Sequence, residues 1–248
     1  MRQLAKLTWV EIKLFIREPL TMIFSLAFPL LVLFVMGGVF GNTPDPKGKI
    51  WGGAGPMDYL VPGFMGLVVA SIGFISLPIH LAGYRERGVL RRFRASSVSP
   101  WALLASQLCV GALIAILGSV AIVVLGMGVD GAHGPVSAVG VLFAFVLCTM
   151  SFVAIGILLG AVLPNAQAAQ AVGLVLFFVS EMTSGVGPPR EVMPETMQQV
   201  AKALPLTHVA VALQDPWIGR GSNIVELGIV AAIAVVAAGL AYRTFRWE

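Results

Sequence analysis

Five arginines and one glutamate stand close together between residues 84 and 100, in the segment YRERGVLRRFRASSVSP. Arginine side chains donate paired hydrogen bonds to carboxylates, so such a block can bind an acidic surface of another protein. Very apolar stretches flank the block on both sides, and the mean hydropathy of the chain is +0.91. Charged side chains in so apolar a chain need water around them. We therefore expect the block to form a loop between two membrane spans.

A second set of polar residues lies inside an apolar run. Glu181 stands toward the end of residues 166–187, next to Ser180, Thr183 and Ser184. Two interpretations stay open: a polar element of a translocation path or outer gate, and a carboxylate near the outer surface that water reaches. Transporters driven by protons or ions generally need ionisable groups deep within their spans. The other apolar runs contain almost none, so we expect the driving force to come from another subunit.

Motifs for catalysis or nucleotide binding are missing from the sequence. It has no glycine-rich phosphate loop ending in Lys-Ser or Lys-Thr, no GxSxG elbow and no HExxH pair. The three histidines, His80, His133 and His208, are far apart in sequence, which argues against a metal site. Cys109 and Cys148 both lie in apolar runs, so we interpret them as buried thiols. We expect no catalytic residue, metal or cofactor in this chain.

Composition sets the class of the protein. Of the 248 residues, 58% are hydrophobic and 11% are charged, against about 25% charged in an ordinary soluble domain. Spanning a bilayer takes about 20 residues of helix. Six runs are long enough: 20–40, 59–83, 101–127, 136–163, 166–187 and 223–242. The sequence therefore predicts an all-α integral membrane protein with a six-span domain over residues 20–242, and a tight hairpin at Pro164 and Asn165.

Basic residues predict the orientation, because they accumulate on the cytoplasmic side. With the N-terminus inside, eleven lie on the inner side: Arg2, Lys6, Lys13, Arg17, Arg85, Arg87, Arg91, Arg92, Arg94, Arg243 and Arg246. Five lie on the outer side: Lys47, Lys49, Arg190, Lys202 and Arg220. Both termini, including a tail at residues 243–248, are then cytoplasmic. The net charge of +4 therefore reflects topology and lipid headgroups, and we expect no nucleic acid partner.

Two segments outside the spans have helical patterns. In residues 1–18, Ala5, Trp9, Ile12, Phe15 and Ile16 share one side, with the basic residues beside it. This pattern is typical of a helix lying in the membrane interface, and a plain topogenic N-terminus is the alternative. Residues 188–217 are rich in proline, and we expect one or two short helices dipping into the outer leaflet, or an ordinary structured loop.

Two features within the spans concern helix packing. The glycines at positions 156 and 160 have the GxxxG spacing that lets helices approach closely, either between two copies of the chain or within one. Pro29, Pro62 and Pro78 fall inside or near spans, where proline kinks helices. Both features therefore concern how the spans pack.

The loop sequence RERGVLRRFRASSVSPWALL resembles the first inner loop of the ABC type-2 permease family, the transmembrane subunits of one class of ATP-driven exporters. That loop has a glutamate, a glycine two residues on, a basic pair and a Ser/Thr-Pro before the third span. The matching residues here are Glu86, Gly88, Arg91 with Arg92, and Ser99 with Pro100. LPNAQAAQAVG between the fourth and fifth spans and ALPLTHVAVAL before the last span are also similar, so the resemblance covers the whole chain.

This resemblance implies a cytoplasmic interface helix at the N-terminus, a coupling helix within residues 85–100 and short outer re-entrant helices. It also implies a separate cytoplasmic subunit that binds ATP and Mg, and a second permease copy in a homodimer or heterodimer. The residues expected to contact the ATP-binding subunit are Arg85, Glu86, Arg87, Gly88, Arg91, Arg92 and Arg94.

The function we expect is that of an exporter permease in a bacterial cytoplasmic membrane. Because the spans hold few charges, an amphipathic cargo such as a drug, a lipid or a glycoconjugate fits better than free ions. A secondary transporter or channel, and a membrane-embedded enzyme or assembly factor, are the alternatives.

Overall fold

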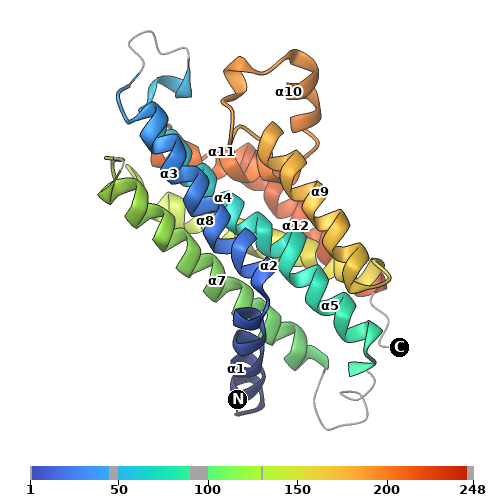
Figure 1. Cartoon of the computed structure of the whole chain (residues 1–248). Helices are drawn as coiled ribbons and strands as arrows, with labels where there is room; N and C mark the ends of the chain where they lie inside the picture. The colour runs from blue at the N-terminus through green and yellow to red at the C-terminus, as the bar shows by residue number, and fades with distance from the viewer. Residues whose placement is uncertain (1, 45–49, 90–99, 130, 245–248) are drawn as a thin grey trace.

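The computed structural model describes residues 2–44, 50–89, 100–129 and 131–244. Within these residues every regular element is helical (Figure 1). Six helices are long and apolar enough to cross a membrane: Ile23–Phe40, Pro56–Glu86, Ala105–Gly128, Ala138–Val162, Ala166–Thr183 and Ile224–Thr244. The prediction of an all-α protein with six spans is confirmed.

The first half of the chain forms the first three spans. Its elements are α1 (Arg2–Arg17), α2 (Pro19–Met22), the π-helix η1 (Ile23–Ala27), α3 (Phe28–Phe40), the 3₁₀-helix η2 (Trp51–Gly53), α4 (Pro56–Ser71), the π-helix η3 (Ile72–Ser76), α5 (Leu77–Glu86) and α7 (Pro100–Gly128). The second half holds α8 (Ala138–Val162), α9 (Ala166–Thr183), the 3₁₀-helix η4 (Arg190–Val192), α10 (Glu195–Ala201), α11 (Pro205–Trp217) and α12 (Ile224–Thr244).

The second span is the centre of the bundle. It runs through α4, η3 and α5 as a continuous 31-residue helix, and its most apolar window is fully buried. The corresponding windows of the first and sixth spans are only 22% buried. Helices α3, α7, α8, α9 and α11 all pack against parts of this span, which we call the central helix. It extends three residues beyond the predicted run at each end. At the C-terminal end, Tyr84, Arg85 and Glu86 continue the last turn because they are bonded to other helices.

Two of the prolines have a local effect on helix geometry. Pro29 and Pro78 each stand within the first two residues of an α-helix that follows a π-helical segment, η1 or η3. Proline lacks an N–H and clashes with the carbonyl four residues earlier, so the wider π turn accommodates it. Pro62, in contrast, lies inside α4 without ending the helix. The two π segments contact each other, so both irregular turns lie at one place in the bundle.

Small residues let α8 and α9 approach the central helix closely. A Cβ atom added at Gly156 would lie 2.8 Å from the Cβ of Leu77, and one at Gly160 would lie 2.7 Å from the Cβ of Leu81. A Cβ atom added at Gly173 of α9 would likewise collide, in this case with the carbonyl oxygen of Phe74. The GxxxG spacing is therefore used for packing within one chain.

The N-terminal helix α1 packs along α7. Glu11 and Phe15, one turn apart, are buried, whereas Trp9 is 58% exposed. Residues 2–17 of the predicted segment 1–18 are helical, but Trp9 does not face inward with Phe15. The Lys13 ammonium lies 5.2 Å from the centre of the Trp9 ring. Position in the membrane interface stays a prediction.

Residues 188–217 contain short helices, as expected, and their depth in the membrane stays a prediction. Helix α11 packs against α4, α8 and α12, and most of its side chains are buried. Helix α9 ends at Thr183, four residues before the end of the predicted run. Gly185 follows with a φ of +88°, a left-handed conformation that suits glycine and turns the chain away from the helix.

The bundle has two ends that matter for function. Helix α1 and the last turn of α5 lie at one end, which we call the loop end (Figure 1). Helix α10 lies at the opposite end, which we call the far end (Figure 1).

Candidate functional site

At the loop end, the last turn of α5 is bonded to the N-terminal helix. The hydroxyl of Tyr84 donates a hydrogen bond to Oε1 of Glu11 over 2.8 Å. Only 3% of Glu11 is exposed, and a buried carboxylate needs such a donor because burial without one is costly. Sequence reasoning missed this residue, although its position one turn before Phe15 places it on the same face of the helix.

Arg85 binds the end of the fourth span. Its Nη1 donates to the carbonyl oxygens of Gly160 at 3.0 Å, Ala161 at 2.7 Å and Leu163 at 3.2 Å. The last carbonyls of a helix have no partner within the helix, and a cation there also interacts favourably with the helix dipole. Arg85 therefore closes the end of α8 and fastens it to α5.

Glu86 binds the start of the fifth span. Its Oε2 accepts a hydrogen bond from the backbone N–H of Ala166 over 3.2 Å, at the end of α9 where a negative charge is favoured. The side chain of Asn165 accepts from the N–H of Ala168 in the same turn. Two consecutive residues of α5, Arg85 and Glu86, thus hold the predicted hairpin from both sides.

The structure describes two of the remaining residues of the predicted contact set, Arg87 and Gly88. Arg87 is exposed beyond the end of α5, and Gly88 has a φ of +65°, so the chain turns there. Arg91, Arg92 and Arg94 lie outside the described residues. Among the described members, Arg87 is the arginine free to meet another protein, whereas Arg85 is engaged within the chain. Contact with an ATP-binding subunit stays a prediction for the whole set.

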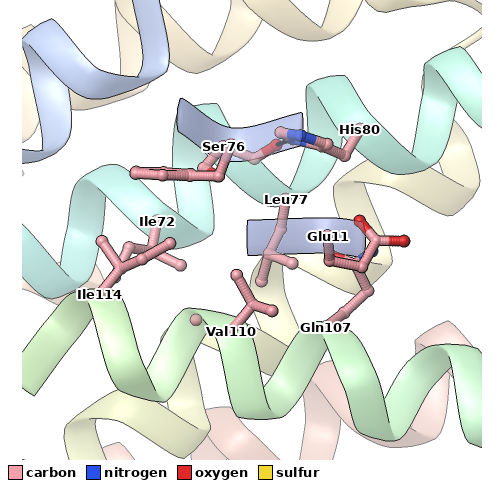
Figure 2. Close-up of a pocket in the computed structure, with 10 residues that line it drawn as sticks. Glu11, Ile72, Ser76, Leu77, His80, Gln107, Val110 and Ile114 are labelled. Carbon is pink, nitrogen blue, oxygen red and sulfur yellow. Dashed lines mark hydrogen bonds between the residues drawn. The ribbon is translucent and has the colours of Figure 1, made fainter. Parts of the chain in front are cut away.

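A small cavity adjoins these contacts, between α1, the central helix and α7 (Figure 2). Its polar lining consists of Glu11, Ser76, His80 and Gln107, and Figure 2 shows them among apolar side chains. The volume open to the centre of a water molecule is about 10 Å³, room for about one water molecule. This cavity is too small for a cargo molecule.

The polar set around Glu181 is buried near the end of α9. Glu181 is 2% exposed, and Ser180, Thr183 and Ser184 are buried as well. The hydroxyl of Thr183 donates to the carbonyl oxygen of Val179 over 2.7 Å. Within the described part of the chain, Oε2 of Glu181 and the hydroxyl of Ser180 have no hydrogen-bond partner. The set therefore includes a buried carboxylate, Glu181, whose Oε2 accepts no hydrogen bond from the described residues.

Arg190 fastens the end of α9 to α11. Its Nε donates to the carbonyl oxygen of Ser184 and its Nη2 to that of Thr207, each over 2.9 Å. Gln214 of α11 in turn donates to the carbonyl oxygen of Tyr59 over 3.1 Å. These bonds connect α9 and α11 to the central helix at the far end. Sequence reasoning counted Arg190 only as an outer charge, because backbone acceptors leave no pattern in the sequence.

Each histidine has a partner within the chain. His80 is bonded to the carbonyl oxygen of Ser76, His133 lies 3.0 Å from a carboxylate oxygen of Asp58, and His208 lies 2.6 Å from one of Glu226. Over the residues that the structure describes, no group of three or more His, Cys, Asp and Glu side chains could hold a metal ion. The three histidines are therefore engaged by contacts within the chain.

Comparison with known proteins gives the family. The family described as ABC-2 type transporter matches residues 2–216. The putative transport permease YvfS of Bacillus subtilis (strain 168) is 25% identical over 213 residues, which cover 84% of this chain and 82% of YvfS. The inner membrane transport permease YhhJ of Escherichia coli (strain K12) is 26% identical over 187 residues, which cover 71% of this chain and 49% of YhhJ. The chain, with its six spans and bonded loop end, therefore belongs to the ABC-2 type transporter family.

Proposed function

We propose that this chain is the permease subunit of an ATP-driven exporter in a bacterial cytoplasmic membrane. A separate subunit binds ATP and Mg and pushes on residues 84–100 from the cytoplasm. One observation supports this most: the last turn of the buried central helix is bonded to three other helices through Tyr84, Arg85 and Glu86. A force applied just beyond Glu86 therefore acts on α1, α8 and α9 together.

The central helix is suited to carry this force across the membrane. Its 31 residues correspond to about 46 Å at roughly 1.5 Å per residue, which exceeds the hydrocarbon thickness of a bilayer. At the far end, the bond between Gln214 and the carbonyl oxygen of Tyr59 links it to α11. A displacement at the loop end is thereby passed to the helices beside the polar set around Glu181.

The cargo path lies between this chain and a second permease copy. The cavity at the loop end holds about one water molecule, whereas large apolar side chains are exposed along α3, α7, α8 and α12. These faces meet lipid or a second copy, and they suit an amphipathic cargo such as a drug, a lipid or a glycoconjugate. Exposed Trp9 and Lys13 of α1 suit the membrane interface with anionic lipid.

Transport in liposomes tests the source of energy. The full chain is reconstituted with and without the ATP-binding subunit, and flux of an amphipathic dye is measured with ATP alone and with an ion gradient alone. We expect flux only with the subunit and ATP. Flux driven by an ion gradient without nucleotide would instead support a secondary transporter or channel.

Replacement of Glu181 by glutamine tests the proposed translocation path. The amide keeps the size of the side chain and removes its charge, so the chain should still fold. We expect a changed export rate or cargo preference, by about threefold or more, because charged groups within spans interact strongly with what passes them. Glu195→Gln, on exposed α10, is the matched control. Equal export and cargo preference in both variants would show that the Glu181 carboxylate takes no part in the translocation path.

A further inference from the structure

We propose that the cavity at the loop end is a binding site for one water molecule, and that this water joins α1, α5 and α7. The cavity lies where these three helices meet, and it is lined by one polar side chain from each: Glu11, His80 and Gln107 (Figure 2). All three are at least nine-tenths buried, with exposed fractions of 3%, 7% and 3%. Figure 2 shows them around the same small space.

Two polar atoms in this lining lack a hydrogen bond. Within the described residues, Nε2 of His80 and Nε2 of Gln107 have no hydrogen-bond partner. The carboxylate oxygen of Glu18 lies 3.5 Å from Nε2 of His80, a contact without a hydrogen bond. Buried polar groups are nearly always bonded to protein or to ordered water. Two unbonded groups facing one cavity therefore point to a small polar ligand.

The donors and acceptors match water. Nδ1 of His80 lies 2.9 Å from the carbonyl oxygen of Ser76, which only accepts, so Nδ1 carries a hydrogen. Glu11 also accepts, and the amide nitrogen of Gln107 donates. A water molecule both donates and accepts, so it can donate to Glu11, accept from Gln107 and bond Nε2 of His80 in either role. All three groups are then satisfied by one molecule.

The size and walls of the cavity exclude other occupants. Its open volume of about 10 Å³ admits about one water molecule. Ile72, Val110 and Ile114 form apolar walls around the polar groups. Three hydrogen bonds are the usual number for a buried water, so the site is complete with a single molecule.

This water would link the two helices on either side of the arginine-rich loop. Glu11 is bonded directly to Tyr84 of α5 and reaches Gln107 of α7 through the water. Helices α5 and α7 are thus held together through the N-terminal helix. This consequence for coupling rests on the proposed function, whereas the water site itself does not.

Two variants of the full chain distinguish a hydrated cavity from a dry one. Gln107→Leu removes a donor, and Val110→Leu fills the space without removing a polar group. If water is bound, both lower the Tm of the chain in nanodiscs, by at least about 2 °C. If the cavity is dry, Gln107→Leu removes an unbonded polar group and Val110→Leu fills a void, so both raise the Tm. A rise in both variants would overturn the proposal.

Direct detection of the water completes the test. In the full chain in nanodiscs, magnetisation transfer from water to the side-chain amide protons of Gln107 is expected, and it should be lost in Val110→Leu. Absence of transfer in the unchanged chain would overturn the water site. Neither measurement needs the ATP-binding subunit, so failure here and failure of the proposed function are separate outcomes. If the proposed function also holds, the Glu11→Ala variant should still fold but lose coupled ATP hydrolysis.

Discussion

Reversing the charge of three loop arginines, in the triple variant Arg87→Glu, Arg91→Glu and Arg92→Glu, is expected to reduce cargo-dependent ATP hydrolysis at least about 100-fold. Hydrogen bonds to charged groups contribute roughly 1.5–3 kcal/mol each, and about 1.4 kcal/mol corresponds to a factor of ten. Two lost contacts already reach this effect, and the new glutamates add repulsion from an acidic partner. The measurement is the ATPase rate of the assembled complex in liposomes, with and without cargo.

The control for this variant is a charge reversal elsewhere at the loop end. Arg243→Glu changes an exposed residue in the last turn of α12 and should leave coupled hydrolysis within about twofold of the unchanged chain, because single surface contacts contribute little. Membrane insertion of all variants is checked by protease accessibility. Unchanged coupling in the inserted triple variant would refute the assignment of the loop as the contact for the ATP-binding subunit.

Replacing Arg85 by alanine is expected to destabilise the chain itself, by about 2–4 kcal/mol in the free energy of unfolding. The guanidinium is bonded to the carbonyl oxygens of Gly160, Ala161 and Leu163, and its removal leaves them without this donor. The measurement is reversible unfolding of the full chain in mixed micelles. The neighbouring exposed Arg87 supplies the control, since Arg87→Ala should change stability by less than about 0.5 kcal/mol.

This pair of alanine variants separates a structural role from a partner contact. If Arg85→Ala folds as stably as Arg87→Ala but loses coupled hydrolysis, Arg85 acts on the ATP-binding subunit and not on α8. If Arg85→Ala is destabilised while Arg87→Ala loses coupling, the two arginines have the separate roles that the structure indicates.

The spans were predictable from sequence because lipid leaves the backbone few choices. Every N–H and C=O in the membrane must be bonded within a helix, so a long apolar run is sufficient evidence for a membrane-spanning helix. The ends of the second span were not predictable in the same way. Arg85 and Glu86 are charged and therefore resemble loop residues, yet backbone groups of α8 and α9 satisfy them and the helix continues.

The long-range contacts of the site were beyond sequence reasoning for a related reason. Glu11 and Tyr84 are 73 residues apart, and no local pattern pairs them, although Glu11 lies on the same face as Phe15. The glycines at 156 and 160 predicted close helix contact, but the spacing alone does not say whether the neighbour is the same chain or a second one. Leu77 and Leu81 of the central helix supply the answer.

The most direct test of the central claim is whether a nucleotide hydrolase binds this chain through residues 84–100. The tagged full-length chain and its triple charge-reversal variant are each purified in mild detergent from the native host membrane, and ATP hydrolysis in the eluates is measured. We expect strong hydrolysis with the unchanged chain and background hydrolysis with the variant. Equal hydrolysis in both eluates, or none with the unchanged chain, would contradict binding of a nucleotide hydrolase through these residues.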